Sequence, residues 1–198
     1  MSVGPSEVTI CSTNDDFSSS DRLKRDLILA WGTGDVRELR DIVIKGDLDL
    51  SYCTKLCRLP DGLFVGGSLI LNECTGLVWI GRCSVGVDLV LDGCTSLESL
   101  SEVVVGRHLK LSSCIELQFL PEDLDIPGDL FVDHCVKLEQ FPEIISVGRS
   151  INVEYCSLLK ILPVISGFQK DGMRHHVYIK ESGIVVDANN NKFIVYHY

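Results

Sequence analysis

Aliphatic residues recur along most of this chain in the pattern L-x-L-x-x-C-x-x-L, which occurs six times. The first position and the cysteine of each copy are Leu48 and Cys53, Leu69 and Cys74, Leu89 and Cys94, Leu109 and Cys114, Leu130 and Cys135, and Ile151 and Cys156. Successive cysteines are 20 or 21 residues apart. This period, with alternating aliphatic positions, is typical of a solenoid in which each coil buries its apolar side chains against its neighbours.

Each copy combines a short strand with an irregular return path. The strand positions, such as Leu69 and Leu71, alternate with other residues, which is the periodicity of a strand with one buried side. Prolines such as Pro60 disfavour a regular helix on the return path, so we expect 3₁₀ or extended segments there. An aliphatic residue, often followed by glycine as in Val65-Gly66, then closes the coil at a tight corner. We therefore predict a six-repeat solenoid over residues 44–167.

The flanking segments lack the repeat. Residues 1–19 contain many Ser, Asp and Asn residues and few apolar ones, which predicts a disordered segment. Residues 20–43 carry apolar side chains at helical spacing, which predicts a helical N-terminal cap. Residues 168–198 contain strand-like stretches, and the turn signal at residues 189–191 predicts a C-terminal β-hairpin cap. The expected fold is a β-rich or mixed solenoid with a parallel sheet and two different caps.

The pattern resembles that of leucine-rich repeat proteins, with cysteine where many such repeats carry asparagine. The short unit with Leu-Pro on the return path, as in Leu59-Pro60, is similar to repeats of bacterial proteins, including effectors delivered into host cells. Plant disease-resistance receptors also contain L-x-L-x-x-C-x-x-L-x-x-L-P, as in Leu48 to Pro60, although their units are usually longer. The resemblance covers residues 44–167. It implies a parallel sheet on a concave side, with the residues that flank the strand leucines facing solvent.

These flanking residues form three columns, named here by their position relative to the two strand leucines. The start column, before the first leucine, is Asp47, Ser68, Asp88, His108, Asp129 and Ser150. The middle column, between the two, is Asp49, Ile70, Val90, Lys110, Phe131 and Asn152. The end column, after the second, is Ser51, Asn72, Asp92, Ser112, Asp133 and Glu154. Seven of these 18 residues are acidic and one is basic, so the implied face is acidic with an apolar centre.

Charge narrows the class of partner. The chain has 28 acidic and 18 basic side chains, a net charge of −10, which disfavours nucleic acid and anionic membranes and favours basic protein surfaces. We predict a non-catalytic interaction module that binds a basic, partly apolar protein segment. The candidate binding residues are Asp49, Ile70, Val90, Asp92, Lys110, Phe131, Asp133, Asn152 and Glu154. The alternative that the acidic face only maintains solubility stays open.

Location and assembly follow from weaker signals. No stretch approaches the ~18 consecutive apolar residues of a membrane-spanning helix. The first 20 residues lack the features of a secretory signal, and nine cysteines in such a chain indicate a reducing compartment. We therefore expect a monomer in the cytoplasm or delivered into a host cytosol. A self-assembling structural repeat protein is the alternative.

The cysteines and histidines are the candidates for chemistry. We expect the repeated thiols to be buried, spaced about 4.8 Å apart, and weakly hydrogen-bonded to loop carbonyls. A straight row does not offer the tetrahedral corners that zinc needs, and no second pair matches Cys53 and Cys57, so no metal or cofactor is expected. An enzyme with a Cys/His site at His134 and Cys135 is less favoured, because neighbouring strand residues point to opposite sides. The His175-His176 pair is interpreted as a surface turn.

Overall fold

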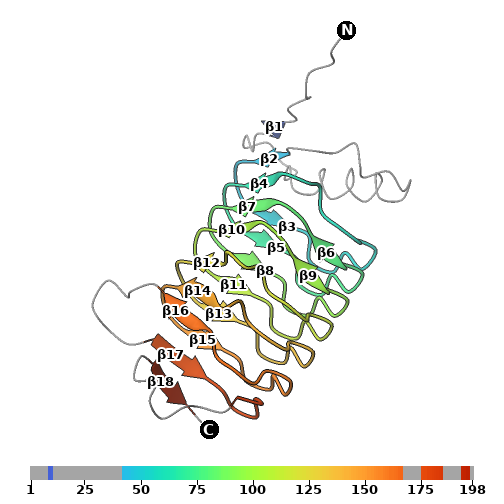
Figure 1. Cartoon of the computed structure of the whole chain (residues 1–198). Helices are drawn as coiled ribbons and strands as arrows, with labels where there is room; N and C mark the ends of the chain where they lie inside the picture. Colours follow the sequence, from blue (N-terminus) through green and yellow to red (C-terminus); the bar gives the residue numbers. More distant parts are fainter. Residues whose placement is uncertain (1–8, 11–41, 167–174, 185–192, 197–198) are drawn as a thin grey trace.

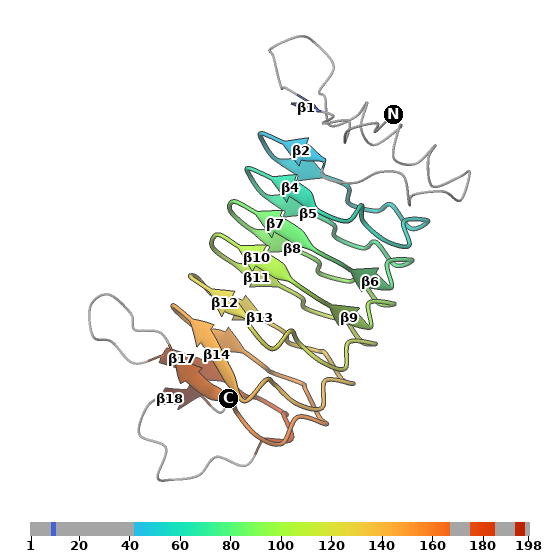
Figure 2. The same ribbon diagram turned by 45° about the horizontal axis from the view of Figure 1, so that its top comes forward.

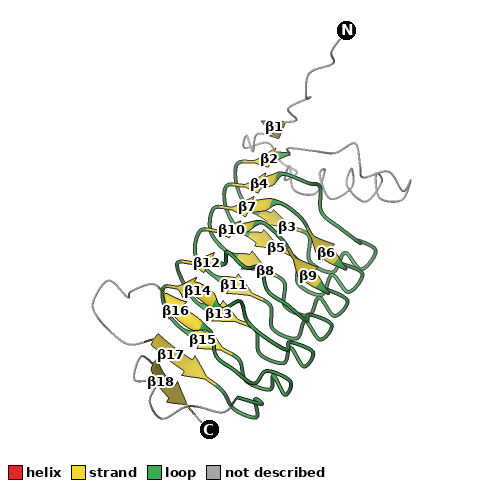
Figure 3. Ribbon diagram, viewed as in Figure 1, coloured by secondary structure: helices red, strands yellow, loops and turns green. Residues whose placement is uncertain are grey.

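The computed structural model describes residues 9–10, 42–166, 175–184 and 193–196. All strands in these residues are two to four residues long, and no helix occurs among them (Figure 3). Figure 1 shows the chain winding as coils stacked along one axis, and the strands of successive coils pair in parallel. The described part is therefore a parallel β-solenoid whose coils recur about every 20 residues.

The longest sheet, called the long sheet below, is built from the strands of the leucine pattern. Equivalent strands of successive coils pair in register, as Leu69 does with Leu89 and Ile70 with Val90. Because side chains alternate along a strand, Leu89 is fully buried and Val90 lies half-buried on the outer face. The strands along the stack are β3 (Leu48–Asp49), β5 (Leu69–Ile70), β8 (Leu89–Val90), β11 (Leu109–Lys110), β13 (Leu130–Phe131), β15 (Ile151–Asn152), β17 (His175–Tyr178) and β18 (Phe193–Tyr196).

A second side of the solenoid is formed where each coil closes, and Figure 2 shows its strands stacked beside the long sheet. One sheet contains β1 (Thr9–Ile10), β2 (Val43–Ile44), β4 (Leu63–Val65), β7 (Cys83–Val85) and β10 (Val103–Val105), and another contains β12 (Asp125–Ile126), β14 (Ile144–Val147) and β16 (Val164–Ser166). We call these two the corner sheets. The predicted tight corner is thus preceded by a strand. The sequence alternates here as a strand does: Leu63 and Val65 are buried, and Phe64 between them is exposed.

The return path is extended, with little regular pairing. Its strands are β6 (Trp79–Ile80) and β9 (Ser99–Leu100), which pair in parallel, and isolated bridges join Arg58 to Trp79 and Phe119 to Gln140. Glycine at the corner lets successive coils approach closely. A Cβ added to Gly106 would overlap the carbonyl oxygen of Gly86, one coil earlier.

The turn after each long-sheet strand directs the repeated cysteine inward. The residue before each cysteine has a left-handed backbone, with φ of 63° at Tyr52, 56° at Glu73, 76° at Gly93, 63° at Ser113, 60° at His134 and 60° at Tyr155. Five thiols then donate a hydrogen bond to the carbonyl of the residue directly after the long-sheet strand of the preceding coil: Cys74 to Leu50 (3.1 Å), Cys94 to Leu71 (3.1 Å), Cys114 to Leu91 (3.3 Å), Cys135 to Leu111 (3.1 Å) and Cys156 to Val132 (3.0 Å). The spacing between sulfur atoms stays a prediction.

The described C-terminal strands continue the long sheet, whereas the predicted hairpin turn and all but Ile184 of its first arm, residues 184–186, lie outside the described residues. Strand β17 pairs in parallel with β15, and β18 pairs in parallel with β17, so both extend the long sheet beyond residue 167. The fourteen residues 179–192 between them are long enough for the crossover that a parallel pair requires, whereas a hairpin needs only a short turn. Buried Val177 lies opposite Ile151 and continues the interior.

The predicted helical cap over residues 20–43 lies outside the described residues, apart from Ile42 and strand β2, and so does the turn signal at residues 189–191. Most of the segment predicted to be disordered, residues 1–19, lies outside them as well. Within it, Thr9–Ile10 forms β1, which pairs in parallel with β2.

Candidate partner-binding face

The middle column runs across the outer face of the long sheet from coil to coil. Strand register places each member beside the next, in the order Asp49, Ile70, Val90, Lys110, Phe131, Asn152, Tyr178 and Tyr196. The first six are the residues predicted from sequence. The two tyrosines were missed because the C-terminal segment was assigned to a cap. The signal was present in the alternation of His176, Tyr178 and Lys180 with aliphatic Val177 and Ile179.

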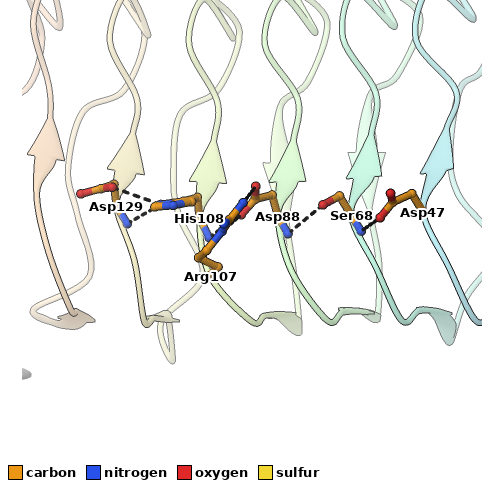
Figure 4. Close-up of polar contacts among 6 residues, drawn as sticks. All are labelled: Asp47, Ser68, Asp88, Arg107, His108 and Asp129. Carbon is orange, nitrogen blue, oxygen red and sulfur yellow. Dashed lines mark hydrogen bonds and ion pairs between the residues drawn. The ribbon is translucent and has the colours of Figure 1, made fainter.

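The start column binds the backbone of the neighbouring coil (Figure 4). Each of its first five side chains accepts a hydrogen bond from the next member's backbone N–H: Asp47 from Ser68 (2.6 Å), Ser68 from Asp88 (3.4 Å), Asp88 from His108 (3.1 Å), His108 from Asp129 (2.9 Å) and Asp129 from Ser150 (2.9 Å). These side chains satisfy amides at the start of each strand. Their first role is therefore to hold successive coils in register.

Two acids of the start column also have side-chain partners. The Arg107 guanidinium donates to Asp88, with Nε 2.8 Å from Oδ1, and this hydrogen bond holds the pKa of Asp88 below its usual value. In Asp129, Oδ2 lies 3.1 Å from Nδ1 of His108, but this nitrogen accepts the Asp129 N–H and so does not donate to the carboxylate, which leaves Arg107 as the cation of this pair of contacts. The negative charge of this column is thus partly matched within the protein.

The end column contains a short hydrogen-bonded chain. Asp92 accepts the Ser112 N–H (3.0 Å), the Ser112 hydroxyl donates to Asp133 (2.7 Å), and Asp133 lies 3.1 Å from Nδ1 of His134. Burial raises the pKa of Asp92, and the hydrogen bond from Ser112 only partly opposes this effect. An ionised carboxylate here therefore costs stability.

A depression of about 410 Å³ lies on the outer face over β13, β15 and β17. Phe131 of β13 and Asp129 just before this strand line one side, and Tyr178 of β17 lines the other. Between them lie the shorter side chains of Asn152 in β15 and of Ser150 and Glu154 near the two ends of that strand. The depression exists because the side chains of the β15 coil are shorter than the aromatic side chains Phe131 and Tyr178 of the two neighbouring coils. Three of its lining residues, Phe131, Asn152 and Glu154, were predicted as binding residues.

Both aromatic side chains of the depression, Phe131 and Tyr178, also contact residues outside it. The Lys110 ammonium lies 5.8 Å from the centroid of the Phe131 ring. On the far side, the Tyr178 and Tyr196 rings stack with centroids 5.0 Å apart, and the Tyr196 hydroxyl lies 3.0 Å from Nδ1 of His176. Such contacts restrict the rotamers of the aromatic side chains in the free protein, so less conformational entropy is lost when a partner binds.

The other predicted binding residues are spread along the face. Ile70, Val90 and Lys110 continue the middle column away from the depression. Asp49, near one end of the column, accepts the backbone N–H of Ser51 (2.8 Å). Asp92 and Asp133 are joined through Ser112. The structure thus places the predicted residues on one face, and the C-terminal part of that face is hollowed.

The candidate catalytic residues have other contacts. The Cys135 thiol is buried and donates to Leu111, and burial raises its pKa, which disfavours a reactive thiolate. His134 instead stacks on Tyr155, with ring centroids 4.4 Å apart. In the described ranges, no three His, Cys, Asp or Glu side chains are grouped to hold a metal ion, and the eight cysteines found there are free thiols. That part of the chain also contains no helix with the length and apolar character needed to cross a membrane.

No protein-family model, curated protein or solved structure matches this chain. Its function must therefore be inferred from its own residues and their geometry.

Proposed function

We propose that the outer face of the long sheet binds a basic, partly apolar protein segment and carries out no catalysis. The observation that carries this proposal is the middle column. Ile70, Val90 and Phe131 lie half-buried in one registered row on the outer face. Acidic residues flank the row on both sides.

The physical roles on this face differ between the apolar and the acidic residues. Exposed carboxylates speed the encounter with a basic partner but contribute little to the energy of the complex. Desolvation of aromatic and aliphatic side chains contributes more, and a few such residues dominate most interfaces. Phe131 and Tyr178, on either side of the depression, are the expected centre of the contact.

The repeat pattern supports membership of the leucine-rich repeat proteins with short, bacterial-type units. An effector role in a host cytosol would rest on that resemblance alone. The corner strands are a feature that the resemblance did not imply. A monomeric state, with the alternative of self-assembly, also stays a prediction. Sedimentation at several concentrations separates the two, because self-assembly would give a mass that rises with concentration.

The proposal is tested by panning a phage-displayed random peptide library on the full chain. The enriched peptides should combine Arg or Lys with aliphatic residues. A fluorescent synthetic peptide from this set should bind the double variant Phe131→Ser, Val90→Ala about tenfold more weakly than the unmodified chain, which corresponds to the loss of roughly one interface anchor.

The matched control is Phe64→Ser with Val104→Ala, which makes the same replacements at outward positions of a corner sheet. Phe64 is 44% exposed and Val104 is 63% exposed, so both are at least as accessible as the residues tested. Equal weakening by both double variants, or enrichment of acidic peptides, would contradict the proposal.

A further inference from the structure

We propose that the depression between Phe131 and Tyr178 is the anchor site for an arginine side chain of the partner. This inference rests on the proposed function and assigns its anchor residue. The guanidinium would lie between the two aromatic side chains, with carboxylates at the two ends of the depression. The remaining basic and apolar residues of the partner would lie along the middle column.

The spacing of the two aromatic side chains suits a flat group. Phe131 and Tyr178 lie on strands β13 and β17, which are separated only by β15. Adjacent strands are about 4.8 Å apart, so the two Cα positions are on the order of 10 Å apart. This leaves room for one planar group with an aromatic side chain on each side. The volume of about 410 Å³ also accommodates the stem of the side chain and part of the backbone.

The polar lining supplies acceptors at both ends. Among the described residues, no side-chain hydrogen bond or ion pair engages the Glu154 carboxylate, whose backbone N–H is held by Asn152 Oδ1 (3.0 Å). At the other end, Asp129 uses Oδ1 for the Ser150 N–H and places Oδ2 near His108. Glu154 is therefore the acceptor for the paired N–H groups of a guanidinium, and the negative charge of Asp129 attracts the guanidinium from the other end.

Arginine fits this site better than lysine. Its guanidinium is planar, stacks on aromatic rings and donates two parallel hydrogen bonds to one carboxylate, whereas an ammonium is a compact and strongly hydrated charge. The protein already places cations near aromatic rings in these coils. Lys110 lies 5.8 Å from the Phe131 ring centroid and Lys180 lies 5.9 Å from that of Tyr155. Such placements are favourable because the face of an aromatic ring is electronegative.

The test is a titration of the full ¹⁵N-labelled chain with N-acetylarginine amide, followed by NMR. The amide signals of Phe131, Asn152 and Tyr178 should shift and saturate in the millimolar range. N-acetylcitrulline amide has nearly the same shape without the charge and should produce no saturable shift. N-acetyllysine amide should bind more weakly than the arginine compound.

Two variants separate the site from the overall charge. Glu154→Gln should weaken the arginine compound about fivefold, as expected for a partly exposed ion pair. Glu143→Gln removes the same charge at an exposed position on the return path and should leave the affinity unchanged. Equal effects of the two variants would overturn the proposal, as would equal binding of citrulline or tighter binding of lysine.

Failure of this inference is distinguishable from failure of the proposed function. If basic peptides still bind through Val90 and Phe131 while the arginine compound shifts no signal near Tyr178, the anchor assignment is wrong and the binding face stands. If no basic peptide binds the outer face at all, both are wrong.

Discussion

The start and middle columns lie on the same face of the same sheet, two residues apart within each coil, yet their side chains have different roles. In the start column, Asp47, Asp88 and Asp129 each accept a backbone N–H from the next coil. In the middle column, Ile70, Val90 and Phe131 are apolar side chains on the outer face of the sheet. The comparison shows that acidic residues on a solenoid face do not by themselves indicate a binding surface, because some of them hold the coils together.

The largest effect should come from removing a start-column acceptor. Asp88→Ala leaves the His108 N–H without its acceptor and Arg107 without its partner, so the free energy of unfolding should fall by about 2 kcal/mol. Binding of a basic peptide should change little. Urea denaturation measures the first quantity and fluorescence anisotropy the second.

Val90→Ala is the matched variant for that experiment, because it lies two residues further along the same coil. It should weaken peptide binding while lowering stability by less than about 1 kcal/mol, since the side chain is only half-buried. If Asp88→Ala weakened peptide binding as much as Val90→Ala did, the division of tasks between the columns would be wrong.

A smaller effect should appear in the pH dependence of the free energy of unfolding, with opposite signs for Asp88 and Asp92. The pKa of Asp88 is lowered in the folded state, so its contribution is present at neutral pH and is lost as pH falls through that lowered value. The pKa of Asp92 is raised by burial, so its ionisation costs stability at neutral pH, and this cost disappears as pH falls below the unfolded-state value.

Asp88→Asn should therefore be less stable than the unmodified chain at neutral pH, and Asp92→Asn slightly more stable. Both differences should be about 1 kcal/mol or less and should shrink in acid. Denaturation at a series of pH values measures them. Differences of the same sign would show that the local environments of these two carboxylates have been misassigned. A weaker peptide affinity of the more stable Asp92→Asn variant would indicate that this acid serves binding at the expense of stability.

Much of the fold could be predicted from the sequence because the repeat is regular. The period of the leucines and cysteines indicated the coil, its interior and the outer position of the middle column. The pairing of β17 and β18 could not be predicted in this way. Val177 follows its partner Ile151 by 26 residues and Val195 follows Val177 by 18, and no cysteine marks either coil, so the period is lost although the sheet continues.

The candidate site was predicted in part for the same reason. Phe131, Asn152 and Glu154 follow the repeat, but Tyr178 belongs to a strand outside it. The role of the start column could not be predicted from residue types, because Asp, Ser and His can each accept a backbone hydrogen bond but are equally common in other roles at exposed positions. Only the stacking of neighbouring coils reveals which amide each side chain meets.

The middle column of the long sheet is the proposed binding surface. Its most direct test is an NMR footprint, in which the ¹⁵N-labelled chain is titrated with the peptide selected from the library. We expect the amide signals of Ile70, Val90, Phe131 and Tyr178 to shift together with one affinity. Shifts centred on Phe64 and Val104 of the corner sheet, with none in the middle column, would contradict it.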